Sequence, residues 1–232
     1  MNNKKDLIVK EAFALAIQDH QNNNLQGAHS YYQKVLKIDP NHSQALNNIG
    51  IIFEGLGENQ KAKECYEKAI EINPNYAATH YNLGKIFQRL SENQKAKECY
   101  EKTIVINPNY ANAHNNLGNI FKELGKNQKA ISCFEKAIVI NPNHAYAHNN
   151  LGVMFMESKE YQKAKDCYKK AIEINPNYVD AYNNLGVIFK NLGEYQKAKD
   201  CFEKSIELKP NDKVALINKG KILFEKGEFE LA

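Results

Sequence analysis

Residues 77–110 read AATHYNLGKIFQRLSENQKAKECYEKTIVINPNY, and close copies of this segment fill most of the 232-residue chain. Strict recurrence of this length is typical of one structural unit that is copied along the chain. A residue that occurs once in every copy is therefore interpreted first as a packing residue. The spacing is clearest in the prolines and cysteines, which recur every 34 residues: Pro40, Pro74, Pro108, Pro142, Pro176 and Pro210, and Cys65, Cys99, Cys133, Cys167 and Cys201.

Each copy predicts two helices joined by a tight turn. In 77–90, apolar or small residues recur at intervals of three and four, which is the pattern of one helical face. A second helix follows from Ala96 and ends before Pro108, because proline cannot donate a backbone hydrogen bond and disfavours helical geometry in the residue before it. The turn between them carries glycine in three copies, which is a good helix stop: Gly57, Gly125 and Gly193.

A glycine in the middle of each first helix predicts that the paired helix approaches closely there. Mid-helix glycine costs about 1 kcal/mol relative to alanine, a cost that a close approach would justify. The second helices carry small residues that we expect to match these glycines, and a phenylalanine in each first helix would fill the remaining space. These sets are Gly50, Gly84, Gly118, Gly152, Gly186 and Gly220; Ala62, Ala96, Ala130, Ala164 and Ala198; and Phe53, Phe87, Phe121, Phe155 and Phe189.

The repeated unit resembles the tetratricopeptide repeat (TPR) family, whose pattern has Leu-Gly and an aromatic residue in the first helix and Ala, aromatic, Ala and Pro through the second. The other units match nearly as well, with Thr103 and Ser205 replacing the second alanine. The resemblance implies an all-α fold, a right-handed superhelical solenoid of antiparallel helix pairs. In 111–144 the matching residues are His114, Leu117, Gly118, Phe121, Ala130, Phe134, Ala137 and Pro142.

The repeats predict the domain organisation directly. Residues 1–8 form an N-terminal lead-in, residues 9–212 form six repeats, and residues 213–232 form an incomplete seventh. The first repeat has Ala16 in place of the glycine and Asp19 in place of the aromatic residue, which suits a terminal capping repeat. The last segment starts a second helix at Gly227 that then stops, so we expect the chain to be part of something longer. The six repeats are 9–42, 43–76, 77–110, 111–144, 145–178 and 179–212.

Composition excludes several classes of protein. The net charge is only +4 and lysines alternate with acids, whereas a nucleic-acid footprint would need an unbalanced basic stripe. No stretch reaches the roughly 20 apolar residues of a membrane span, and the N-terminus lacks a signal peptide pattern. Stacked helices lie ~8–10 Å apart, too far for a disulfide between neighbouring repeats. Five free thiols then suit a cytoplasmic location.

We find no catalytic or metal-binding pattern. Three histidines form a row, but Leu46, Tyr182 and Leu216 occupy the equivalent position in other repeats, which indicates packing. The spacing of ~8–10 Å between repeats also exceeds what one zinc ion with ligand bonds of ~2 Å bridges. The prediction is a protein that is no enzyme and has no cofactor and no metal. The histidines are His80, His114 and His148.

Polar side chains on the first helices are the candidate ligand-binding residues. In TPR proteins these helices line a concave groove, and carboxamides both donate and accept hydrogen bonds, which suits the backbone of an extended peptide. The second asparagine row is unbroken: Asn48, Asn82, Asn116, Asn150, Asn184 and Asn218. The first asparagine row, Asn47, Asn115, Asn149 and Asn183, is interrupted by Tyr81 and Ile217. Asn112, Asn119 and Tyr146 complete the predicted groove wall.

Two interpretations of these rows stay open. The amides resemble the asparagine ladder of O-linked N-acetylglucosamine transferase repeats and would bind a peptide backbone. Alternatively, asparagine is common at this position across the family and bonds to the neighbouring repeat. A clamp for a C-terminal carboxylate is not expected, because the basic residues of this face lack that arrangement: Lys85, Arg89, Lys122, Lys190 and Lys221.

The sequence thus favours an interaction scaffold that holds an extended peptide or a partner segment in its groove, with no nucleic acid and no membrane as partner. A first alternative is the substrate-selecting repeat arm of a larger enzyme, such as a glycosyltransferase. A second alternative is a self-assembling module that stacks through the uncapped C-terminal end.

Overall fold

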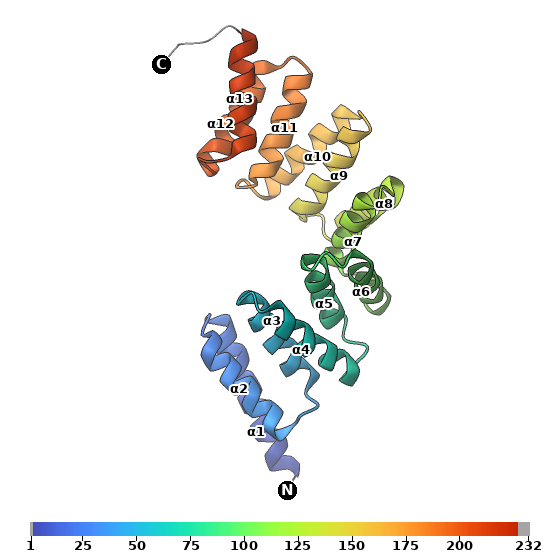
Figure 1. Ribbon diagram of the computed structural model, residues 1–232, viewed down its shortest axis with the longest axis vertical. Coiled ribbons are helices and arrows are strands. Elements are labelled where there is room, and N and C mark those ends of the chain that lie inside the picture. The colour runs from blue at the N-terminus through green and yellow to red at the C-terminus, as the bar shows by residue number, and fades with distance from the viewer. Residues whose placement is uncertain (1, 227–232) are drawn as a thin grey trace. The chain divides into compact units, whose positions relative to one another are not determined.

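The computed structural model describes residues 2–226, which form thirteen α-helices and no strand in that range (Figure 1). The expected all-α architecture of repeated helix pairs is therefore confirmed. The helices are α1 (Asn2–Gln21), α2 (Leu25–Ile38), α3 (Ser43–Gly55), α4 (Asn59–Ile72), α5 (Ala77–Arg89), α6 (Asn93–Ile106), α7 (Ala111–Glu123), α8 (Asn127–Ile140), α9 (Ala145–Glu157), α10 (Tyr161–Ile174), α11 (Val179–Asn191), α12 (Tyr195–Leu208) and α13 (Lys213–Lys226).

The chain divides into two compact units, unit 1 (residues 1–113) and unit 2 (residues 114–232). In unit 1, α1 packs on α2, α3 on α4 and α5 on α6, and each pair contacts the next through α2–α3 and α4–α5. In unit 2, α9 packs on α10 and α11 on α12, and the pairs are joined by contacts of α8 with α9, α10 with α11 and α12 with α13. Odd-numbered helices are called first helices below, and even-numbered helices second helices.

The turns within the helix pairs confirm the predicted glycine stops. Gly57, Gly125 and Gly193 have φ values of 76°, 67° and 73°, a left-handed conformation that glycine adopts without a steric penalty. Ser91 and Lys159 take the same conformation at 60° and 61°, so the turn geometry is kept even where a side chain makes it less favourable.

From α3 to α12, the core of each pair is built on a contact between the mid-helix glycine and an aromatic ring of the second helix. A Cβ atom added at Gly118 would lie 2.6 Å from the ring of Phe134, and one at Gly152 would lie 2.6 Å from Tyr168. The close neighbour of the glycine is thus this ring, and not the alanine of the second helix that the sequence suggested. The rings are 0–1 % exposed: Tyr66, Tyr100, Phe134, Tyr168 and Phe202.

The phenylalanines of the first helices lie beside lysines at the start of the second helices. The Nζ atom of Lys61 lies 5.3 Å from the ring centroid of Phe53, and that of Lys197 lies 5.6 Å from Phe189. A cation over a ring face is attracted by the ring quadrupole, so this contact covers the edge of the helix pair. The same geometry recurs in Lys95–Phe87, Lys129–Phe121 and Lys163–Phe155.

The structure describes only part of the predicted lead-in at the N-terminus and of the predicted seventh repeat at the C-terminus. Helix α1 begins at Asn2, inside the predicted lead-in. Helix α13 buries Ala215 and Ile222 against unit 2. The second helix expected from Gly227 lies outside the described residues, as do the side chains of Leu223 and Phe224. The six-repeat division and the incomplete seventh repeat remain predictions.

Substitution of the core glycines tests the packing argument. Gly186→Ala places a Cβ atom 2.7 Å from the buried ring of Phe202, and overpacking of about 1–3 kcal/mol should outweigh the gain of about 1 kcal/mol in helix propensity. Gly220→Ala is the matched control, because no described atom lies within 4 Å of its added Cβ. Urea unfolding should show a loss for the first and a gain for the second; equal shifts would contradict the packing argument.

Candidate functional site

The predicted groove residues differ in how far they are buried. In the first asparagine row, Asn47, Asn115, Asn149 and Asn183 are only 2–6 % exposed. In the second row, Asn82 is buried, and the others are half-buried: Asn48, Asn116, Asn150, Asn184 and Asn218. Tyr81 and Asn119 are half-buried, whereas Asn112 and Tyr146 are exposed. Most of the amides are therefore partly or fully removed from solvent.

The two rows are hydrogen-bonded to each other across successive repeats, and we call this arrangement the asparagine ladder. In unit 1 the Nδ2 atom of Asn82 donates to Oδ1 of Asn47 at 3.1 Å. In unit 2 the equivalent bonds are Asn150 to Asn115 and Asn184 to Asn149, both at 3.0 Å. These contacts agree with the alternative interpretation, in which the amides bond to the neighbouring repeat. The binding role of the rows stays a prediction.

Each unit ends the ladder differently. The first repeat has Phe13 at the position of the accepting asparagine, and Nδ2 of Asn48 donates instead to the hydroxyl of Tyr32 at 3.0 Å. In unit 2, Nδ2 of Asn183 donates to Asp212 at 3.2 Å, and the Asp212 carboxylate also accepts from the backbone nitrogen of Ala215 at 2.9 Å. The Ala215 bond lowers the pKa of Asp212, with help from Asn183. Asp212 thereby joins the ladder to the start of α13.

In unit 1, Glu54 gathers two cations on the same face. Its Oε1 atom lies 2.9 Å from Nζ of Lys85 and 2.9 Å from Nη2 of Arg89. Its Oε2 atom accepts a hydrogen bond from the Tyr66 hydroxyl at 3.0 Å. The Glu54 side chain is 8 % exposed, whereas Lys85 and Arg89 are 30 % and 48 % exposed. This charged cluster joins α3 to α5, and the sequence did not indicate it.

The equivalent face of unit 2 is more apolar. Val153 and Met156 of α9 and Val187 of α11 are half-buried and pack on the core of the unit. Tyr146 is 58 % exposed, and its ring meets that of Tyr178 edge to face, with the centroids 5.1 Å apart. The faces of the two units therefore present different chemistry.

Two members of the histidine row make local contacts with the preceding turn. His80 and His148 each donate from Nε2 to the carbonyl oxygen of the preceding proline, Pro74 or Pro142, at 2.9 Å. Burial lowers the pKa of His80. Among the side chains that the structure describes, in residues 4–222, no group of three or more His, Cys, Asp or Glu residues is placed to hold a metal ion. These contacts support the packing interpretation of the row.

The cysteines are half-buried and are not joined in disulfides. Burial raises the pKa of Cys65, Cys167 and Cys201 to about 11, and that of Cys99 to about 12. A thiol that stays protonated at neutral pH is a poor nucleophile. These four cysteines are therefore packing residues.

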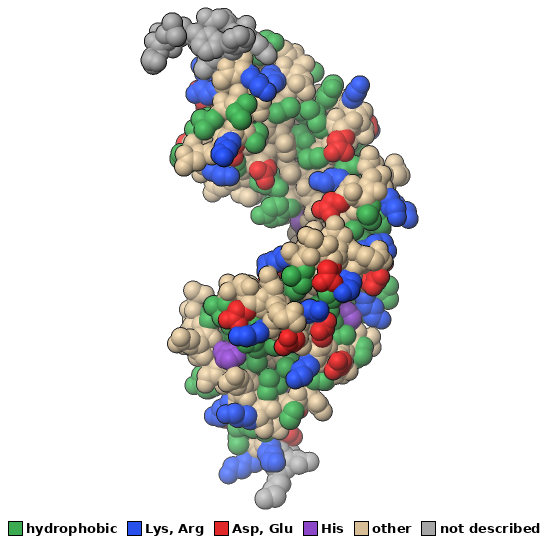
Figure 2. Space-filling model, in the orientation of Figure 1, with side chains coloured by type: hydrophobic (Ala, Val, Ile, Leu, Met, Phe, Trp, Pro, Cys, Tyr) green, Lys and Arg blue, Asp and Glu red, His purple; other side chains and the backbone are tan. Residues whose placement is uncertain are grey.

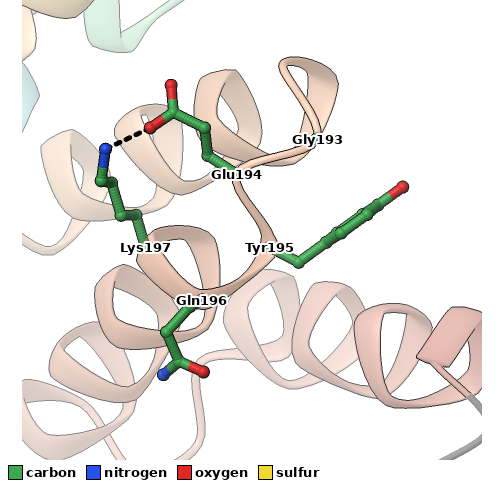
Figure 3. Close-up of a pocket in the computed structure, with 5 residues that line it drawn as sticks. All are labelled: Gly193, Glu194, Tyr195, Gln196 and Lys197. Atoms are coloured by element: carbon green, nitrogen blue, oxygen red, sulfur yellow. Dashed lines mark hydrogen bonds and ion pairs between the residues drawn. The ribbon is translucent and has the colours of Figure 1, made fainter.

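A surface hollow of about 390 Å³ lies at the turn between α11 and α12, lined by Gly193, Glu194, Tyr195, Gln196 and Lys197. Figure 3 shows Lys197 paired with Glu194, while Tyr195 points away from both. The lining comes from five consecutive residues of one turn, away from the predicted groove residues. Figure 2 shows basic and acidic side chains interspersed over the visible face.

The sequence pattern of the tetratricopeptide repeat family matches residues 43–76, 77–110, 111–144, 145–178 and 179–212. The chain therefore belongs to the tetratricopeptide repeat family. This membership places the chain in the class of protein-interaction scaffolds. No helix among residues 2–226 has the length and apolar character needed to cross a membrane.

Similar solved structures have the same fold. PilF of Pseudomonas aeruginosa is 19 % identical with a TM-score of 0.84, covering 96 % of this chain and 99 % of its own. YrrB, a TPR protein with an unusual peptide-binding site, is 21 % identical with a TM-score of 0.63, covering 82 % and 97 %. MamA is 28 % identical with a TM-score of 0.61, covering 70 % and 95 %. No curated protein sequence matches the chain.

Removal of one ladder amide tests its structural role. Asn150 donates to Asn115 and Asn119 at 3.0 and 3.1 Å, so Asn150→Ala leaves the buried Asn115 oxygen without this donor. We expect a loss of about 1–3 kcal/mol in the free energy of unfolding. Asn191→Ala, at an exposed site, is the control and should change it by less than about 0.5 kcal/mol. Equal effects in urea unfolding would exclude a structural ladder.

Acid should weaken the start of α9. The Nδ1 atom of His144 accepts from the backbone nitrogen of Ala147 at 3.2 Å, and burial lowers the pKa of His144. His144 therefore binds a proton more tightly in the unfolded chain than in the folded one. The stability that neutral His144 contributes is present above about pH 6.5 and is lost as pH falls through the lower pKa of the folded state.

The test is thermal unfolding as a function of pH. His144→Asn keeps a side-chain cap but does not titrate, so its stability should fall less between neutral and mildly acidic pH than that of the unaltered chain. Identical pH profiles would show that His144 does not contribute.

Proposed function

We propose that the predicted groove faces of the first helices bind an extended segment of a partner protein. This proposal rests on one observation: the repeats differ from one another mainly on the predicted groove face. The second helices are nearly identical, as in NQKAKECYEKAIEI for α4 and NQKAKECYEKTIVI for α6. The groove face changes from copy to copy, as at Lys85, Asn119 and Val153.

This difference distinguishes residues that pack the repeats together from residues that are available to recognise a ligand. Residues that hold repeats together face the same neighbour in each copy and have reason to stay the same. Side chains that change in charge, size and polarity from copy to copy are not required for the packing that all copies share. Such variation serves a ligand that presents a different group to each repeat. TPR architecture accommodates a peptide-binding site in YrrB, which has the same fold.

The amides have a secondary part in this proposal. A carboxamide has two donor hydrogens and two acceptor lone pairs, and the bond from Asn184 to Asn149 in the ladder uses a single donor. The Asn184 amide therefore keeps further hydrogen-bonding capacity for a peptide backbone. Specificity would come from the variable side chains around them, such as Tyr146 and Met156.

The two alternatives, a substrate-selecting arm of a glycosyltransferase-like enzyme and a self-assembling module, depend on parts beyond residues 2–226. The resemblance to O-linked N-acetylglucosamine transferase repeats rests on the asparagine rows, whose contacts lie between repeats. We therefore place the peptide-binding function first.

A matched pair of valine substitutions tests the proposal. Peptides that bind the purified chain are first selected from a random displayed library. Val153→Ala, on the groove face of α9, should then weaken the selected ligands by about three- to tenfold, since truncation of a contacting side chain costs roughly 1 kcal/mol. Val139→Ala makes the same change on α8, where the residue is 73 % exposed, and should leave binding unchanged.

Tyr146→Ala extends the test to an exposed ring. Because Tyr146 is 58 % exposed, its removal should alter affinity more than stability. If the selected peptides bind all three variants as well as the unaltered chain, the groove face is not the binding site.

A further inference from the structure

We propose that the charged cluster of unit 1 binds acidic side chains of the partner segment. The cluster consists of Glu54, Lys85 and Arg89, with Tyr81 beside it. The inference rests on the proposed function and specifies its ligand chemistry for unit 1. It depends on three properties of the cluster: its net charge, its remaining donors and its aromatic wall.

The cluster has one carboxylate for two cations, because Oε1 of Glu54 lies 2.9 Å from both Lys85 Nζ and Arg89 Nη2. It therefore carries a net positive charge even when both cations are paired with Glu54. This net charge is complementary to an acidic ligand.

The cations keep donors for a ligand. Arg89 has five N–H donors and contacts Glu54 through Nη2, and its side chain is 48 % exposed. Lys85 donates to both Glu54 oxygens, at 2.9 and 3.1 Å, and is 30 % exposed. Glu54 holds both side chains in place, which lowers the conformational entropy that a ligand must remove.

An aromatic wall borders the cations. The ring of Tyr81 lies 4.9 Å from that of Tyr110 and 5.8 Å from that of Tyr100, measured between centroids. The Nζ atom of Lys85 lies 5.6 Å from the Tyr81 centroid. Tyr81 stands where other repeats have an asparagine of the first row, so this repeat replaces an amide with a ring next to the cations. A carboxylate bound there is partly shielded from water, which strengthens its interaction with Arg89 and Lys85.

The experiment uses the full chain and three fluorescent probes of equal length: an oligoglutamate peptide, an oligolysine peptide and a single-stranded oligothymidine. Fluorescence anisotropy should show binding of oligoglutamate that weakens as salt is added, because exposed charges are screened. Arg89→Gln should weaken this binding about tenfold, in keeping with the loss of one partly exposed charge-assisted hydrogen bond.

Further variants separate this site from general charge. Lys190→Gln removes the same charge from the first-helix face of unit 2 and should change oligoglutamate affinity less than twofold. Lys85→Gln with Arg89→Gln leaves Glu54 alone, and the cluster should then prefer oligolysine. Circular dichroism checks that each variant is folded. If the double variant unfolds, the Arg89→Gln variant still tests the proposal, because it retains the Lys85–Glu54 pair.

The outcomes are decisive. Equal effects of Arg89→Gln and Lys190→Gln, or no binding of oligoglutamate, would overturn the proposal, and tighter binding of oligothymidine would replace it with a nucleic-acid surface. Library peptides that lack acids and respond to Val153→Ala but not to Arg89→Gln would also overturn it while leaving the proposed function intact.

Discussion

The contact between a backbone and a ring determines the geometry of the five repeats from residue 43 to residue 212. A buried Tyr or Phe of the second helix lies directly on the glycine of the first, with no room for a methyl group between them. This contact sets how closely the two helices approach. It thereby directs one face of each first helix toward the second helix of the same pair. The opposite face is left for contacts with the neighbouring repeat and for the predicted groove. The asparagine ladder and the charged cluster both lie on residues that this contact positions.

The period and residue types of the sequence were sufficient to predict the helix pairs, the turn glycines and the family. They were sufficient because each of these features depends on residues close together in the chain. The partner of the mid-helix glycine was predicted less well: alanine was expected, and Tyr168 or Phe134 is found. Both kinds of residue lie on the same helical face, and periodicity does not distinguish which of them reaches the glycine.

The site was less predictable than the fold. The asparagine rows were visible, but a row of amides is compatible with a ligand and with a neighbouring repeat. Only distances such as that from Asn82 to Asn47 show that the amides bond between repeats. The Glu54 cluster was missed because Glu54 belongs to one repeat and Lys85 and Arg89 to the next, and these three charges do not recur together in the other repeats. Contacts of this kind depend on side-chain reach across an interface, for which the sequence carries no periodic signal.

The ladder also has a direction. Within each unit a repeat donates from its second row to the repeat before it and accepts through its first row from the repeat after it. Removal or duplication of one whole repeat would bring an equivalent donor to an equivalent acceptor. An insertion of any other length within a helix would turn the amides away from each other. The length of such a protein is therefore free to change in evolution by recombination between its copies, but only in whole repeats.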